Sequence, residues 1–207
     1  SGNVSFYNET NAKSIFPTPV IGGIGVINNL KKVINIRTKE AGNLIAIIGK
    51  TVGHLEQSAF LQENFSINDG PPPEINLENE KNNGLTVLEL INESLVESAH
   101  DISSGGILVS LAEMSMASGL GFKIQKPKKL KNLFEYFFGE DQGRYLIEIS
   151  KNNLKKAQTI TKKNSTFFEI FGEVQNDTFE VEKIFSLKTK DLHKHNNKWY
   201  KSYNAIN

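Results

Sequence analysis

Short apolar runs separated by turn signals constrain this chain most, because they fix both the type and the length of its elements. The runs at 45–48 and 145–147 are strongly apolar and far shorter than a membrane-spanning helix requires. Segments with apolar residues at helical spacing lie between such runs. We therefore expect an α/β fold, a mixed sheet flanked by helices, with strands adjacent in sequence near both ends of the chain.

The same patterns predict the order of the elements. We expect strands at 20–27, 33–36, 44–48, 96–100, 122–124, 145–149, 167–174 and 179–181, the last two joined as a hairpin. We expect helices at 55–65, 75–92, 105–118, 130–138, 154–163 and 189–203. Asn82-Asn83-Gly84 should bend the second helix, and Gly119 should end the third. In the last helix, Leu192, Trp199 and Tyr203 are expected to anchor one side.

Charge and cysteine content exclude several kinds of partner and chemistry. The 207 residues carry 24 Lys and Arg against 23 Asp and Glu, a net charge of +1. The lysine runs at 126–131 and 155–163 lack interleaved aromatic residues and are typical of solvated faces, so no nucleic-acid partner is expected. The absence of cysteine excludes disulfides and thiolate catalysis and fits a reducing, cytoplasmic compartment. No secretory leader is visible, and no membrane partner is expected.

The opening segment, residues 1–10 (Ser-Gly-Asn-Val-Ser-Phe-Tyr-Asn-Glu-Thr), is a polar loop that contains a glycine. Gly2 has no Cβ, so its backbone can approach a phosphate or a hydrated cation closely. An ordinary turn before a strand explains the same residues, and their spacing alone favours that reading. The glycines at 22–25 lie inside an expected strand rather than at a strand-to-helix turn, so they do not form a phosphate loop.

A second polar loop, 100–106, joins a strand to a helix. Asp101 or Ser103 is expected to cap that helix, although the amides at its start could instead hold an anion. His100 and Asp101 are neighbours on a strand and should point to opposite faces, which disfavours a catalytic dyad.

A third polar loop, 138–144, is bracketed by glycines. Glu140 and Asp141 could bind a cation and Arg144 a phosphate, but an internal salt bridge accounts for the same residues, and we favour it. His54, His193 and His195 show no metal-ligand spacing.

Taken in order, these segments resemble the C-terminal part of the phosphoribosylformylglycinamidine synthase family, within the aminoimidazole ribonucleotide synthetase superfamily. The resemblance covers nearly the whole chain. Its motifs are residues 1–10, 17–22, Gly53-His54-Leu55 with Gln57-Ser58, 70–73, 100–106, Ala112-Glu113-Met114, 138–144 and 172–174.

The resemblance implies an ATP-dependent ligase of purine biosynthesis. Its reaction converts formylglycinamide ribonucleotide, ATP and glutamine-derived ammonia into formylglycinamidine ribonucleotide, ADP and phosphate. ATP phosphorylates the amide oxygen, ammonia displaces the phosphate, and Mg²⁺ neutralises charge on the phosphoryl group. The implied partners are a glutaminase subunit and a small bridging subunit.

The resemblance also implies roles for individual residues and segments. Gly2 would contact ATP through its backbone, Asn3 would offer its side-chain oxygen to Mg²⁺, and Ser5 would bind the ribonucleotide. Residues 1–16 would end a preceding ATP-site domain, 17–188 would form the C-terminal synthetase-type domain, and 189–207 would form a helical tail. The family's catalytic histidine and acidic metal ligands would lie upstream, so the polypeptide alone is expected to be inactive.

Two departures and two rival functions remain open. Ser104 stands where the family usually has Asp, which weakens a metal role for that loop, and Glu56 replaces a small residue before Gln57. The chain could instead belong to another ATP-dependent enzyme of the superfamily, or it could be a non-catalytic assembly or regulatory module.

Overall fold

The computed structural model describes residues 7–15, 22–127 and 132–204, and its contacts divide the chain into the units 1–33 and 34–207. The first unit contains a small antiparallel pair, β1 (Glu9–Thr10) and β2 (Lys13–Ser14), and a 3-10 turn, Leu30–Lys32, capped by the Asn29 side chain. Residues 22–27 form no strand, so the described part of the strand expected at 20–27 is not observed.

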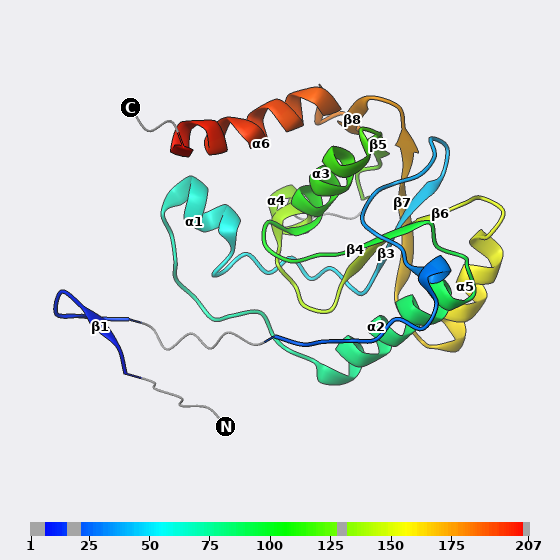
Figure 1. Ribbon diagram of the computed structural model, residues 1–207, viewed down its shortest axis with the longest axis horizontal. Coiled ribbons are helices and arrows are strands. Elements are labelled where there is room, and N and C mark those ends of the chain that lie inside the picture. Colours follow the sequence, from blue (N-terminus) through cyan, green and yellow to red (C-terminus); the bar gives the residue numbers. More distant parts are fainter. Residues whose placement is uncertain (1–6, 16–21, 128–131, 205–207) are drawn as a thin grey trace. The chain divides into compact units, whose positions relative to one another are not determined.

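The second unit is built on a seven-stranded mixed sheet (Figure 1). Its strands, in spatial order, are β4 (Ser98–Asp101), β6 (Tyr145–Ile149), β3 (Leu44–Ile48), β7 (Phe168–Gln175), β5 (Gly121–Ile124), β8 (Thr178–Val181) and β9 (Phe185–Lys188). All neighbouring pairs are antiparallel except β5 and β8, which are parallel. The expected α/β class with a mixed sheet is therefore confirmed.

Helices cover both faces of this sheet (Figure 1). On one face, residues of α3 (Gly106–Ser118), α4 (Leu133–Phe138) and the first turns of α6 (Thr189–Asn204) join the larger apolar cluster. On the other face, α2 (Leu77–Asn92) and α5 (Leu154–Lys163) build the second cluster. The short helix α1 (Ala59–Phe65) follows the loop after β3. Among the described residues, none of the helices combines the length and the hydropathy that a membrane-spanning helix needs.

Strand β3 shows how the sequence produces this layered core. Ile45 and Ile47 belong to the first cluster, whereas Ala46 and Ile48 belong to the second. Successive side chains of a strand point to opposite faces, so a continuous apolar run suits a strand that is covered on both sides. Each of the four residues is at most 1% exposed, and burying one isoleucine side chain contributes about 1.5–3 kcal/mol.

One expected strand, one expected helix bend and one expected hairpin are not observed in the described residues. The strand expected at 33–36 is absent among the described residues, and α2 runs without a break through Asn83 and Gly84. The Asn83 side chain donates to the carbonyl oxygen of Gly143 at 2.8 Å, so it serves tertiary packing rather than a bend. The hairpin of β7 with β8 was also wrong, because β5 lies between them in the sheet.

The last helix is anchored only by its first turns in the described residues. Thr189 is buried and Leu192 packs on the first cluster, while His193 Nε2 lies 2.5 Å from the carbonyl oxygen of Met116. The expected anchors Trp199 and Tyr203 are instead 64% and 82% exposed. The apolar residues in the second half of this helix are therefore exposed, whereas Leu192 in its first turns packs on the first cluster.

Candidate functional site

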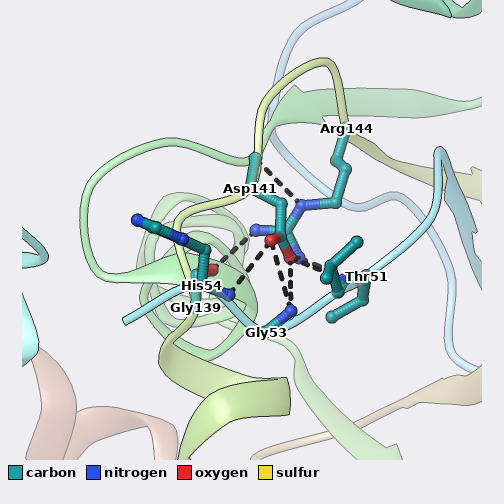
Figure 2. Close-up of polar contacts among 7 residues, drawn as sticks. Thr51, Gly53, His54, Gly139, Asp141 and Arg144 are labelled. Carbon is teal, nitrogen blue, oxygen red and sulfur yellow. Dashed lines mark hydrogen bonds and ion pairs between the residues drawn. The ribbon is translucent and has the colours of Figure 1, made fainter. Parts of the chain in front are cut away.

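At one place in the second unit three loops whose motifs carried the family resemblance meet, and Figure 2 shows the contacts between the first and the third of them. They are the loop after β3, the loop from β4 to α3, and the loop from α4 to β6. Hydrogen bonds from the third loop, residues 139–144, join it to the other two. We call this meeting point the loop junction.

Asp141 is the centre of the loop junction. Its carboxylate accepts backbone hydrogen bonds from Val52 at 2.9 Å, from Gly53 at 3.0 and 3.2 Å, and from His54 at 3.1 Å. Asp141 is 7% exposed. Hydrogen bonds to an ionised acceptor are about twice as strong as neutral ones, so this carboxylate fixes the loop after β3.

Arg144 completes the loop junction from the same loop. Its Nε donates to the carbonyl oxygen of Asp141 at 3.1 Å, and its Nη2 donates to the carbonyl oxygen of Gly139. Its Nη1 donates to Thr51 Oγ1 at 3.0 Å and lies 3.5 Å from Asp141 Oδ2. Burial lowers the pKa of Arg144, and the neighbouring Asp141 opposes that shift, so the guanidinium stays charged. The favoured internal salt bridge is confirmed, and Arg144 is not a free phosphate ligand.

Glu140 links the loop junction to two helix starts. Its Oε1 accepts from the Ala59 amide at 2.8 Å, at the start of α1, and from the Gly105 amide at 2.7 Å, at the start of α3. The expected capping of α3 by Asp101 or Ser103 was wrong, because the N-cap is Gly105 and no side chain caps it locally. The anion at the α3 N-terminus is thus the protein's own Glu140.

Gly106 allows the close approach of α3 to the loop junction. It has φ +68°, and a Cβ there would lie 2.8 Å from the carbonyl oxygens of both Phe137 and Gly139. Only glycine meets both conditions, a left-handed backbone and no room for a side chain.

Two polar cavities open beside the loop junction. One of about 360 Å³ is lined by Asp101, Ser103, Ser104 and Gly143 among others, and one of about 490 Å³ by Lys50, Asn79 and Phe167 among others. Glu80 and Gln142 line both. The size of each falls within the range of small-molecule sites.

His100 lies at the edge of this region. Its Nε2 is 2.7 Å from Glu113 Oε2 on α3, and its Nδ1 is 3.3 Å from Asp101 Oδ1. The expectation that His100 and Asp101 point to opposite faces was therefore wrong for their side-chain ends, because the Asp101 side chain, 67% exposed, turns toward the ring. The shorter contact, with Glu113, joins β4 to α3.

The structure also shows the surroundings of His54 and of Ser104 and Glu56, the two residues that differ from the family pattern. His54 Nε2 lies 3.0 Å from the carbonyl oxygen of Pro71. No group of three or more His, Asp or Glu residues in the described ranges could hold a metal ion. Ser104 lines the smaller cavity, and the Glu56 side chain lies against Gly70, where it would meet an added Cβ.

The predicted ligand contacts Gly2, Asn3 and Ser5 lie outside the described residues, so their roles stay predictions. The sequence reading missed Glu148, a fully buried carboxylate on β6. It accepts from Asn43 Nδ2 at 2.8 Å, from Ser98 Oγ at 2.9 Å and from the Lys39 amide at 2.9 Å. The available signal was a single acid within the apolar run Tyr-Leu-Ile-Glu-Ile at 145–149.

Comparison with known proteins supports the family assignment. The chain is 47% identical over 203 residues to the phosphoribosylformylglycinamidine synthase subunit PurL of Pelagibacter ubique, covering 98% of this chain and 28% of that protein. It is 38% identical to the same subunit of Bartonella bacilliformis, covering 98% of this chain and 27% of that protein. The chain thus spans little more than a quarter of the length of these relatives.

Solved structures support the fold. Thermotoga maritima PurL complexed with ATP matches with a TM-score of 0.61 at 20% identity, covering 79% of this chain and 27% of that one. The same protein complexed with FGAR matches with a TM-score of 0.66 at 20% identity, covering 79% and 30%. The family described as AIR synthase related protein, C-terminal domain, matches residues 40–184. The resemblance inferred from the motifs is confirmed, and the chain belongs to the AIR synthase related protein family through its C-terminal domain.

Proposed function

We propose that this chain is the C-terminal part of an ATP-dependent carbon–nitrogen ligase of purine biosynthesis. The parent protein would convert formylglycinamide ribonucleotide to formylglycinamidine ribonucleotide with ATP and glutamine-derived ammonia. The observation that carries the proposal is the 47% identity to a phosphoribosylformylglycinamidine synthase subunit over 98% of this chain. Structures of the similar Thermotoga maritima protein complexed with ATP, ADP and AMPPCP support a nucleotide as one ligand. A further structure complexed with FGAR, the abbreviation of formylglycinamide ribonucleotide, supports this ribonucleotide as the other ligand.

The described domain would act as a rigid support rather than as the reacting centre. The carboxylates and the guanidinium at the loop junction are already engaged within the protein, Glu140 by two amides and Asp141 by three. Fixed loops of this kind hold the neighbouring polar cavities in one shape. We propose the domain limits 1–16, 17–188 and 189–207 for the end of the ATP-site domain, the synthetase-type domain and the tail.

The ligand contacts would come from the opening segment. Gly2 would approach ATP, Asn3 would face Mg²⁺, and Ser5 would bind the ribonucleotide. The described residues contain no cluster of three or more His, Asp or Glu side chains that could hold a metal ion, and Asn3 is the residue proposed to contact Mg²⁺. A glutaminase subunit and a small bridging subunit would complete a cytoplasmic complex.

The test is an assay of the full-length parent for ADP release that depends on formylglycinamide ribonucleotide and ammonia. Asn3→Ala should lower this activity by about tenfold or more, in the range typical of lost metal-site contacts. Asn28→Ala is the matched control, because Asn28 is exposed and is not assigned to the site. Equal activity of the two variants would remove the role of Asn3.

Two other results of the same assay would overturn the broader proposal. A parent protein with no turnover that depends on this ribonucleotide would favour a non-catalytic module or another enzyme of the superfamily. Turnover by the purified 207-residue chain would contradict the proposal that this polypeptide is inactive alone.

A further inference from the structure

The sequence contains two pairs in which Asp or Asn precedes glycine, Asp69-Gly70 and Asn83-Gly84. Such pairs are prone to a chemical change of the main chain, in which the amide nitrogen of the glycine attacks the side-chain carbonyl carbon of the residue before it. Glycine favours this reaction because it has no Cβ and its backbone rotates freely. The sequence alone ranks Asn83 first, since a side-chain amide loses ammonia more readily than a carboxyl group loses water.

The structure reverses this order, because Asn83 and Gly84 lie in the middle of α2. An α-helix engages its main-chain amides in hydrogen bonds to carbonyl oxygens of the preceding turn, which holds the Gly84 nitrogen in place. Asn83 is 8% exposed, and its Nδ2 donates to the carbonyl oxygen of Gly143 at 2.8 Å. Reaction at Asn83 therefore requires α2 to open first.

Asp69 and Gly70 lie instead in the loop 66–76, which joins α1 to α2 within the second unit. Gly70 has φ +94°, and its amide nitrogen lies 2.8 Å from Asp69 Oδ1. The attacking nitrogen and the carboxyl group are therefore already neighbours, and proximity of this kind raises the rate of an intramolecular reaction. No helix or strand has to open before the two groups react.

We propose that Asp69 is a modification site, at which aspartate converts spontaneously to isoaspartate. The Gly70 nitrogen bonds to the carboxyl carbon of Asp69, and the amide proton leaves with the carboxyl hydroxyl as one water, so that a cyclic imide remains. Water then adds back to the imide. Cleavage of the new bond restores aspartate, whereas cleavage of the original peptide bond yields isoaspartate. The conversion is redox-neutral and needs no cofactor, and it is independent of the proposed function.

The contacts of this loop decide what the modification does to the protein. Gln57 Nε2 donates to the carbonyl oxygen of Gly70 at 2.9 Å, and His54 Nε2 lies 3.0 Å from the carbonyl oxygen of Pro71. Isoaspartate lengthens the main chain by a methylene group and shifts both carbonyl groups, so these contacts are lost. His54 and Pro73 line the larger cavity, and the wall of that cavity changes with the loop.

The test is prolonged incubation of the 207-residue chain in neutral buffer and in concentrated urea, followed by digestion with trypsin. Cleavage after Lys50, Lys81 and Lys123 places the two pairs on separate peptides. Isoaspartate in each peptide is measured by fragmentation and by methyl transfer with an isoaspartyl methyltransferase. In buffer, Asp69 should yield about tenfold more isoaspartate than Asn83, because α2 opens rarely. In urea the order should reverse. Faster conversion of Asn83 in both solutions would overturn the proposal.

Three variants give an independent measurement. Asp69→Glu should abolish the signal from this peptide, because the longer side chain would have to close a larger ring, and a signal that persists would contradict the proposal. Gln57→Ala removes the hydrogen bond that restrains Gly70 and should raise the rate at Asp69 by about two- to tenfold. Gln62→Ala, exposed on α1, is the matched control and should leave the rate unchanged. Equal rates in the two glutamine variants would overturn the restraint assigned to Gln57.

Discussion

Arg144 donates from Nε to the main-chain carbonyl of Asp141, three residues earlier, and its Nη1 lies 3.5 Å from the Asp141 carboxylate. That carboxylate in turn accepts the amides of residues 52–54. Arg144 is 1% exposed, so the pair is a buried ion pair whose remaining hydrogen-bonding capacity is used by the main chain. Both residues therefore act on loop conformation rather than on a ligand.

Asp141→Ala should destabilise the domain by about 3–5 kcal/mol, because it leaves a buried guanidinium without its counter-charge and three amides without an acceptor. Gln142→Ala, next to it and exposed, should stay within about 0.5 kcal/mol of the unmodified protein. Urea unfolding of the two variants measures the difference. Equal stability would show that the amides of 52–54 find other acceptors.

Glu148→Gln should cost about 1–3 kcal/mol although the side-chain volume is nearly kept. The buried carboxylate accepts hydrogen bonds from Ser98, Asn43 and the Lys39 amide. The NH₂ group of a Gln side chain can only donate, so at least one of these three donors would lose its acceptor. Glu173→Gln is the control, since Glu173 forms an exposed ion pair with Lys151 at 3.1 Å and such pairs contribute less than about 1 kcal/mol. A smaller loss for Glu148→Gln than for the control would refute this account.

Gly106→Ala should destabilise more than Gly119→Ala. Both glycines have positive φ, +68° and +81°, so each alanine meets a left-handed backbone cost of about 1–2 kcal/mol. Only at Gly106 would the new Cβ also lie 2.8 Å from two carbonyl oxygens, whereas nothing lies within 4 Å at Gly119. Chemical denaturation measures the two losses. Equal losses would mean that the α3–α4 contact relaxes freely.

Tyr136→Phe should be close to neutral at pH 7, because the buried hydroxyl has no hydrogen-bond partner among the described residues. Burial raises the pKa of Tyr136, and Glu169 raises it further. The unfolded chain releases this proton near pH 10 while the folded protein keeps it, so stability falls as pH rises above about 10.

The same substitution should therefore reduce the loss of stability at alkaline pH. Burial also raises the pKa of Tyr145, so part of the alkaline dependence should remain in the variant. Urea midpoints at neutral pH and above pH 10 give both quantities. A loss of more than about 1 kcal/mol at neutral pH would show that the hydroxyl is satisfied after all.

Local patterns predicted the elements whose boundaries depend on local chemistry. The helix 154–163 has the observed bounds of α5, and Gly119 ends α3 in the left-handed conformation. The runs at 44–48 and 145–149 coincide with β3 and β6. Periodicity and glycine conformation act over a few residues, so the sequence carries them directly.

At the site, the sequence named the residues but not most of their partners. It placed Glu140, Asp141 and Arg144 in one loop and favoured a salt bridge, which the structure confirms. It assigned the α3 cap to nearby side chains, whereas the acceptor, Glu140, lies 35 residues from Gly105. A cap supplied from another loop leaves no trace in local spacing.

By itself, the sequence determined the α/β class, the buried strands and the family, because these depend on apolar periodicity and on an ordered series of motifs. Only the tertiary structure decided that β5 lies between β7 and β8, that Glu140 joins two helix starts, and that Glu148 is buried among hydrogen-bond donors. These features join residues that are distant along the chain, and they exist only where packing brings an acceptor within about 3 Å of its donors.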